Sequence, residues 1–111
     1  MQYNYLGCFL ANPDGDYGLT PVVAQQILTT SVNDCATLCG TWPGGPTLYF
    51  TLGTNDASQA VCTCGSELVA FQYSHLGLNF RCSTPCQLSS GLGVYCGGRY
   101  DGYPLVSVFG A

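Results

Sequence analysis

Residues 31–40, with the sequence SVNDCATLCG, and residues 62–64, with the sequence CTC, decide the fold of this chain. Cys35 and Cys39 are four residues apart, a spacing that places two side chains on one face of a helix. Residues 60–64 have the composition of a strand. We expect Cys35 and Cys39 to form disulfides with this strand. We expect the side chains of Cys62 and Cys64 to point to opposite faces of this strand, so a strand that takes both bonds should bulge, end, or lie beside the edge of the helix.

The helix that carries these two cysteines has predicted ends. Ser31 is a preferred N-cap residue, and Asp34 follows three residues later, close to the arrangement of a capping box. Val32 and Ala36 continue the apolar spacing of a helix together with the cysteines. Gly40 is well placed as the residue that ends it.

The rest of the chain predicts an antiparallel sheet beside one or two short helices. Two strand-like segments, separated by turn residues at 53–56, predict a hairpin, and the last strand could pair with the first. Pro21 and the apolar residues after it favour a short helical turn. The expected strands are 5–10, 47–52, 60–64 and 104–109, and the expected loops are 12–16, 42–46 and 88–102. The predicted class is a small, disulfide-rich α+β domain.

Eight cysteines among 111 residues indicate a secreted chain held by disulfides. Their number allows 105 pairings, so spacing alone does not give the connectivity. A thiolate zinc site is the alternative, because the pairs at 35/39 and 82/86 have loosely suitable spacing. A C-x-C pair is a poor zinc knuckle, so disulfides are favoured and no metal or cofactor is expected. The half-cystines are Cys8, Cys35, Cys39, Cys62, Cys64, Cys82, Cys86 and Cys96.

Charge excludes several partners. Only 7% of the residues are charged and the net charge is −4, so nucleic acid and a polybasic membrane contact are disfavoured. No apolar run approaches the roughly 20 residues that span a bilayer. Residues 1–5 have neither the basic nor the apolar region of a signal peptide. We therefore expect a single mature secreted domain over residues 1–111.

Catalysis has little support in the sequence. His75 is the only histidine, and no partner for a base role is identifiable. Asp14 with Asp16, or Asp101 with Glu67, could be drawn as the carboxylate pair of a glycosidase. Asp14 and Asp16 stand among turn residues, where an Asx turn is the more common role. We expect a protein that is not an enzyme.

The aromatic residues favour a sugar site. Tyr, Phe and Trp make up 13% of the chain, and several of them, Tyr17 included, fall in expected loops. Residues 99–103 combine arginine, carboxylate and tyrosine, which can bind both the hydroxyls and the apolar face of a sugar. In small disulfide-rich domains such aromatic residues often cover the core instead. The candidate ligand-binding residues are Trp42, Tyr73, His75, Asn79, Arg81, Arg99, Tyr100, Asp101 and Tyr103.

The order of cysteines and their flanking residues resembles the WSC domain over essentially the whole chain. The matching motifs are Tyr5-x-Gly7-Cys8-Phe9, the C-x3-C pairs, Cys62-x-Cys64-Gly65, Cys96-Gly97-Gly98 and Val106-Ser107-Val108-Phe109. This resemblance implies a fungal extracellular, carbohydrate-binding module with a PAN/apple-like fold. The long loop around residues 14–27 and the segment 99–103 depart from the family pattern, so the identity of the ligand does not carry over.

The resulting expectation is a secreted fungal glycan-binding protein, similar to the small lectins of mushroom fruiting bodies. Weak single sites would then require multivalency, which a homo-oligomer could supply. Two alternatives are a secreted protein-binding effector or defence protein on the same scaffold, and a small hydrolase.

Overall fold

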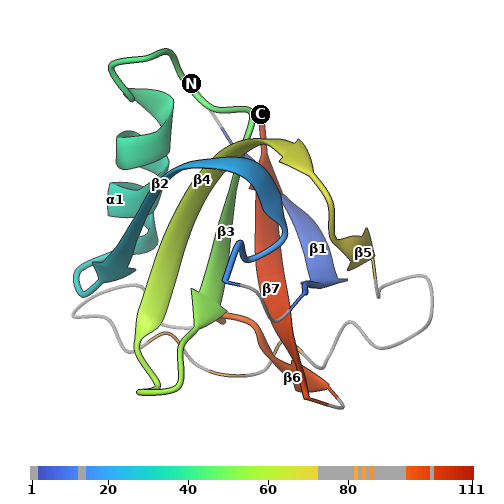
Figure 1. The fold of residues 1–111 in the computed structure, drawn as a ribbon. Coiled ribbons are helices and arrows are strands. Elements are labelled where there is room, and N and C mark those ends of the chain that lie inside the picture. Colours follow the sequence, from blue (N-terminus) through green and yellow to red (C-terminus); the bar gives the residue numbers. More distant parts are fainter. Residues whose placement is uncertain are drawn as a thin grey trace.

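The computed structural model describes residues 3–12, 15–72, 82, 84, 86, 95–100 and 102–111, and it shows one antiparallel sheet with one helix (Figure 1). The strands follow the order β2-β4-β3-β7-β1-β5, and β6 also pairs with β7. Their bounds are β1 Asn4–Leu10, β2 Leu19–Leu28, β3 Tyr49–Thr54, β4 Ala60–Leu68, β5 Phe71–Gln72, β6 Gly98–Tyr100 and β7 Tyr103–Gly110, with helix α1 at Val32–Gly40. The predicted coarse class, a small disulfide-rich domain with an antiparallel sheet and a short helix, is confirmed.

The four predicted strands are present, and their pairing follows the prediction. β3 and β4 form the hairpin, with Thr54 opposite Ala60. The last strand, β7, pairs with the first, β1, so that Cys8 lies opposite Ser107. These strands were predictable because turn residues separate apolar segments whose side chains fill both sides of the sheet.

The predicted helical turn after Pro21 is wrong, because these residues belong to strand β2. β2 pairs along β4, with a register shift between Val22 and Ala24. The β-branched Val22, Val23 and Ile27 favour an extended chain once β4 supplies partners for the backbone. Pro21 is tolerated because β2 is an edge strand, where a missing N–H need not break a ladder. The expected loop at 88–102 is also corrected in part, since it contains β6.

Helix α1 begins as predicted but continues through Gly40. Ser31 is the N-cap residue, although its side chain makes no capping hydrogen bond. Gly40 lies inside the helix instead of ending it. The C-cap is Thr41, whose backbone N–H and hydroxyl both donate to the carbonyl oxygen of Thr37, at 3.0 and 2.6 Å. The threonine hydroxyl thus adds a second hydrogen bond to a carbonyl that the Thr41 N–H already satisfies.

The sheet has two faces, which differ in what covers them. The helix face carries Phe50, Leu52, Cys62 and Cys64, which pack with α1. The opposite face, here called the tyrosine face, is covered by Tyr17 and the beginning of β2. Residues two apart on a strand share a face, and the tyrosine face is formed by Thr51, Gly53, Val61, Thr63, Gly65, Val106 and Val108.

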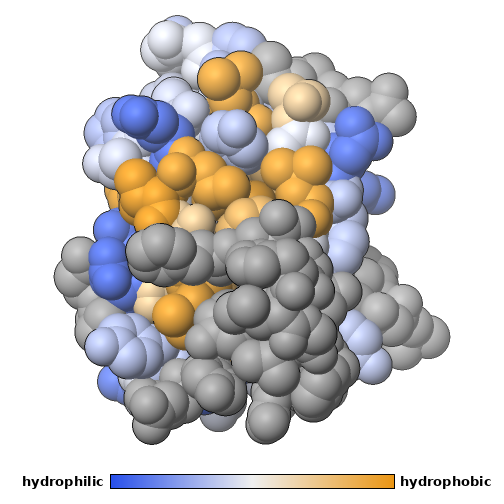
Figure 2. All heavy atoms as spheres, turned by 90° about the vertical axis from the view of Figure 1, so that its right-hand side faces the viewer, coloured by the Kyte–Doolittle hydropathy of each residue, from blue (hydrophilic) through white to orange (hydrophobic). Residues whose placement is uncertain are grey.

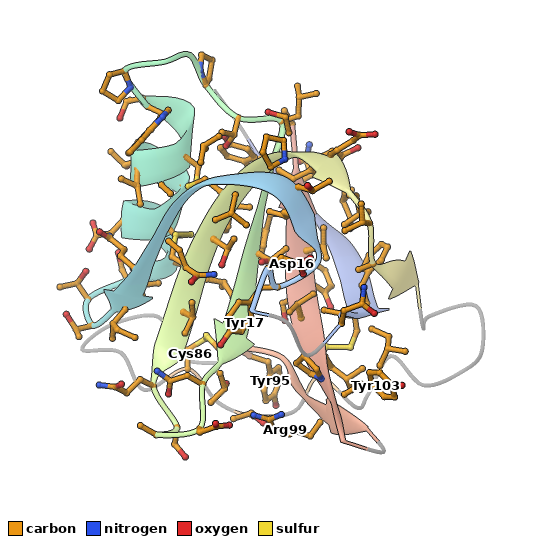
Figure 3. The ribbon with its side chains drawn as sticks, in the orientation of Figure 1. Asp16, Tyr17, Cys86, Tyr95, Arg99 and Tyr103 are labelled. Carbon is orange, nitrogen blue, oxygen red and sulfur yellow. A yellow bond between two sulfur atoms is a disulfide. The ribbon has the colours of Figure 1, made fainter. Side chains whose placement is uncertain are left out.

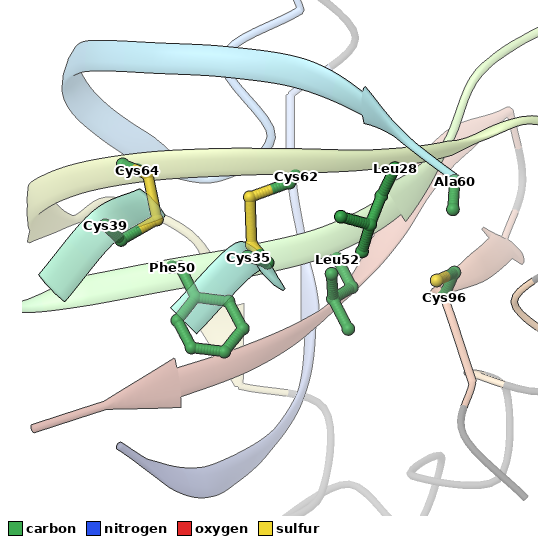
Figure 4. Close-up of a cluster of buried hydrophobic side chains, with 9 residues drawn as sticks. All are labelled: Leu28, Cys35, Cys39, Phe50, Leu52, Ala60, Cys62, Cys64 and Cys96. Atoms are coloured by element: carbon green, nitrogen blue, oxygen red, sulfur yellow. A yellow bond between two sulfur atoms is a disulfide. The ribbon is translucent and has the colours of Figure 1, made fainter. Parts of the chain in front are cut away.

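Two disulfides join α1 to the helix face, as predicted. Cys35 bonds with Cys62 and Cys39 bonds with Cys64 (Figure 4). All four residues are fully buried. The expectation that Cys62 and Cys64 point to opposite faces is wrong. β4 does not end at Cys64 and keeps a regular register with β3, and the register shift opposite Cys64 and Gly65 adds its extra residue to β2. Residues two apart point the same way, just as residues four apart do on the helix.

The other two disulfides also lie on the helix face. Cys8 bonds with Cys82 beside Leu105, and Cys86 bonds with Cys96, which packs against Leu52. No cysteine is free. This oxidised state is typical of extracellular proteins. Among the described residues, no helix has the length and apolar character needed to cross a membrane.

Candidate functional site

Tyr17 occupies a tight turn before β2. Its φ is 49°, a left-handed conformation that is uncommon for residues other than glycine. The turn is closed by the Asp16 carboxylate, which accepts a hydrogen bond of 2.9 Å from the Gly18 N–H. The predicted Asx turn is therefore confirmed for Asp16, while Asp14 lies outside the described residues. This arrangement turns the chain onto the tyrosine face of the sheet.

Tyr17 is held from both its backbone and its ring. The hydroxyl of the buried Thr51 donates to the Tyr17 carbonyl oxygen at 2.9 Å. The ring lies directly over Gly53, where an added Cβ atom would come within 2.7 Å of Cε1. Only glycine leaves room for the ring at this position. A half-buried aromatic side chain is therefore fixed at the end of β3 (Figure 3).

A polar pocket with a volume of about 240 Å³ opens beside this ring. Arg99 lies opposite Pro104 in the β6–β7 ladder, and Asp56 comes from the β3–β4 turn. We call this hollow the arginine pocket; its lining residues are Asn12, Gly15, Tyr17, Thr54, Asn55, Asp56, Arg99 and Pro104. Four separate segments of the chain therefore meet there.

Arg99 and Asp56 form an ion pair in the arginine pocket. The Nη2–Oδ1 distance is 2.9 Å, and the side chains are 52% and 101% exposed. Exposed pairs contribute little to stability because water solvates both charges. The pair therefore leaves hydrogen-bonding groups accessible at the pocket, with donors on the guanidinium and acceptors on the carboxylate.

The turn that presents Asp56 is organised by Asn55. Its Oδ1 accepts hydrogen bonds from the backbone N–H groups of Ala57 and Gln59, at 3.0 and 2.9 Å. Its Nδ2 donates to the Gln59 side chain at 3.1 Å. These contacts fix the position of the Asp56 backbone although its side chain is in solvent. The turn was predicted from its residue types, but its role in a pocket was not.

Burial and two neighbouring charges act on the pKa of Tyr17. Burial raises the pKa of the Tyr17 phenol above its ordinary value, the positive charge of Arg99 opposes this shift, and the negative charge of Asp56 adds to it. At neutral pH a phenol is protonated with or without this shift, and its hydroxyl can both donate and accept hydrogen bonds.

The structure brings together only some of the predicted ligand-binding residues. Arg99 and Tyr103 lie in the same lower part of the molecule (Figure 3). Tyr100 pairs with Tyr103 along the backbone. Five other candidates lie outside the described residues: Tyr73, His75, Asn79, Arg81 and Asp101.

Trp42 lies at the opposite end of the sheet from Arg99. The loop that contains Trp42 reaches Leu48, whose carbonyl accepts a hydrogen bond from Ala111 after the end of β7. Arg99 instead pairs with Pro104 near the beginning of β7. At about 3.3 Å per strand residue these points are roughly 20 Å apart. Trp42 and Arg99 therefore belong to different surfaces.

The pocket also contains residues that were not among the candidates. Tyr17, Asn12, Asn55 and Asp56 were each assigned to turns or loops, and only their proximity in the fold joins them to Arg99. The available signal was the aromatic residue within an Asp-Tyr-Gly turn at residues 16–18. Such a turn exposes or positions a side chain that a strand would bury.

The close cysteine sulfurs offer no metal ligands. The Sγ atoms of Cys35, Cys39 and Cys62 lie within 4.8 Å of one another. Each of them is bonded to another sulfur in a disulfide, so none is the thiolate that a zinc site requires.

No protein-family model, curated protein or solved structure matches this chain.

Proposed function

We propose that this chain is a secreted glycan-binding protein, and that it binds carbohydrate without catalysis at the arginine pocket. The observation that carries the proposal is the fixed Tyr17 ring beside the accessible Arg99–Asp56 pair. A sugar ring presents hydroxyls on its edges and C–H groups on its faces. The pocket offers an aromatic surface for the C–H groups. It also offers side-chain donors and acceptors for the hydroxyls.

The composition of the pocket supports a neutral ligand. Arg99 and Asp56 compensate each other's charge, and Asn12 is an exposed amide that can donate and accept. The net charge of −4 adds a general repulsion toward anionic glycans. Such a site forms few contacts, so we expect weak binding at each site and a biological effect that depends on multivalency.

The proposal also includes the family, the PAN/apple-like fold and the fungal origin of the chain. The cysteine order, with glycines beside Cys8, Cys64 and Cys96, resembles the WSC domain and supports a PAN/apple-like fold of fungal origin. Gly97 illustrates why one of these glycines is needed. An added Cβ there would collide with the backbone carbonyl of Leu105 and lie 3.3 Å from the Val106 Cα.

A glycan array with the oxidised protein tests the proposal, with Arg99→Ala as the first variant. Binding to at least one neutral glycan is expected. Because a hydrogen bond to a charged group contributes about 1.5–3 kcal/mol, Arg99→Ala should weaken binding roughly tenfold or more. Asp56→Asn should weaken it as well. Glu67→Gln is the matched control, since it removes an exposed carboxylate of β4 outside the pocket. A silent array would overturn the proposal.

A protein partner is the second candidate, and one observation favours it. Apolar side chains gather on the side of the molecule formed by β1 and β5 (Figure 2). Leu6 in β1 and Val69 before β5 are each 41% exposed. Exposed apolar groups of this kind often mark contact surfaces when they are contiguous. Binding to a cell surface that survives enzymatic deglycosylation, and that Leu6→Ser abolishes, would favour this candidate over a lectin.

A further inference from the structure

A second pocket lies directly beside the arginine pocket. Its volume is also about 240 Å³, and Tyr17 and Asn55 line both hollows. We call it the glutamine pocket; its lining residues are Tyr17, Gln25, Gln26, Ile27, Asn55 and Val61. The two pockets therefore meet at Tyr17 and Asn55.

The strand register places the glutamine pocket on the tyrosine face of the sheet. Gln25 pairs with Thr63 and Ile27 pairs with Val61, and directly paired residues point to the same face. Gln25 confirms this placement, because its Nε2 donates to the Thr63 hydroxyl at 3.1 Å. The arginine pocket lies at the end of the same sheet. A path therefore runs from the sheet end, past Tyr17, onto the sheet face.

The walls of the two pockets are connected to each other. Besides Thr63, the Gln25 amide donates to the carbonyl oxygen of Gly15 at 2.9 Å. Gly15 lines the arginine pocket and Gln25 lines the glutamine pocket. Together with the bond from Thr51 to Tyr17, this contact fixes the spacing of the pockets before any ligand binds. Such preorganisation lowers the entropy cost of binding.

The size and chemistry of the pockets indicate what they would hold. Small-molecule sites usually have volumes of about 300 Å³ or more, so each pocket alone is small, whereas the two together reach this range. Apart from the Tyr17 phenol, which is uncharged at neutral pH, the glutamine pocket is lined by amide and apolar side chains. A ligand that extends there should carry hydroxyl or amide groups and no charge.

From the adjacent pockets we infer that the ligand is a linear, neutral oligosaccharide that spans both, with one sugar ring on each side of Tyr17. This inference rests on the proposed glycan-binding function and adds the length and charge of the ligand. The ring in the arginine pocket contacts Arg99 and Asp56, and the next ring lies against Ile27 and the Gln25 amide. A single sugar fills only one of the two pockets and therefore binds more weakly.

The test is a chain-length series. Linear gluco-, manno- and N-acetylgluco-oligosaccharides of one to six rings are titrated by calorimetry into the wild-type protein. We expect the affinity of the preferred series to rise at least tenfold from one ring to the length that fills both pockets, and then to level off. Backbone amide signals of Val61 and Thr63 should shift in NMR spectra only with the longer sugars.

Two variants of strand β2 test whether the glutamine pocket causes the higher affinity of the longer sugars. Ile27→Ala should lower the affinity ratio of the longer sugar to the monosaccharide toward one. Val22→Ala is the matched control: Val22 is 40% exposed, close to the 42% of Ile27, and lines neither pocket. This control should keep the wild-type ratio.

Three outcomes would overturn the inference. If the monosaccharide binds as tightly as the hexasaccharide, the glutamine pocket is not used, although the lectin function stands. If the longer sugars bind better but Ile27→Ala keeps the gain, the second ring lies elsewhere. If no sugar of any length binds and the glycan array is silent, the proposed function fails together with the inference.

Discussion

The two faces of the sheet are built in different ways. The helix face is covalently closed: all four disulfides lie there, and Phe50 stacks on Phe109 with ring centroids 4.6 Å apart. The tyrosine face has no disulfide: it carries a second apolar cluster of Phe9, Ala11, Val106 and Val108. Its covering segment is held by an Asx turn, single hydrogen bonds and the fit of a ring over a glycine. Both pockets described above lie on or beside this second face.

From this difference we infer that the helix face mainly stabilises the fold, while the tyrosine face presents the groups for recognition. A chain with 7% charged residues and a small core gains stability from disulfides, which restrict the unfolded chain. With disulfides stabilising the helix face, the tyrosine face can keep exposed polar groups at the two pockets beside its own apolar cluster. The predictions below test whether the two roles are separable.

Removing a disulfide from the helix face should have the largest effect on stability. Cys35 and Cys62 are 27 residues apart, and the loop-closure relation gives about 3.5 kcal/mol for a crosslink of this length. The double variant Cys35→Ala/Cys62→Ala should lose about this much free energy of unfolding in a denaturant titration. Where it is still folded, it should bind the same glycan with the wild-type affinity. Lost binding in a folded variant would show that the two faces are coupled.

Gly53→Ala should affect recognition more than stability. The added methyl group enters the space of the Tyr17 ring, and overpacking of this kind costs about 1–3 kcal/mol. The ring must move, so glycan binding should be lost while circular dichroism still reports a folded domain. Gly44→Ala is the matched control, since its Cβ would meet Trp42 at 3.5 Å, an ordinary contact. Equal loss of binding in both variants would contradict the role assigned to Gly53.

Alkaline pH should weaken the tyrosine face. Burial raises the Tyr17 pKa, so the folded state holds this proton more tightly than the unfolded chain. The contribution is constant below the unfolded pKa of about 10, and is lost as the pH rises toward the folded value. In denaturant titrations from pH 7 to 11, the free energy of unfolding should fall less steeply with pH in Tyr17→Phe than in the wild-type protein. If the free energy of unfolding falls equally steeply with pH in this variant, other titratable groups cause the loss of stability.

Arg99→Ala should have the smallest effect on stability. Arg99 is 52% exposed and its ion pair is solvated, so the free energy of unfolding should change by less than about 0.5 kcal/mol. Thermal and denaturant unfolding provide the measurement, and Asp56→Asn should behave in the same way. A large destabilisation by either change would mean that the pair supports the fold instead of presenting groups to a ligand.

How far the sequence predicts this molecule differs between elements. Helix α1 and the β3–β4 hairpin were predictable, because cap residues, turn residues and apolar spacing act over a few neighbours. The strands β1 and β7 were predictable from local composition, whereas their pairing joins segments about 100 residues apart. β2 was mistaken for a helical turn because its extended form depends on hydrogen bonds to β4, which is more than thirty residues away in the sequence. Of the candidate site residues, Arg99 and Tyr103 lie at one end of the fold and Trp42 lies at the other.

By itself, the sequence determined the oxidised scaffold: eight half-cystines, with Cys35 and Cys39 on one helix face and a strand pair to receive them. The helix periodicity places Cys35 and Cys39 on one side. The bonds of Cys35 with Cys62 and of Cys39 with Cys64 were decided by the tertiary structure, because spacing leaves the pairing open. The tertiary structure alone decided the pocket. Tyr17, Asp56 and Arg99 are distant in sequence, and no local pattern records that Gly53 leaves room for the tyrosine ring between them.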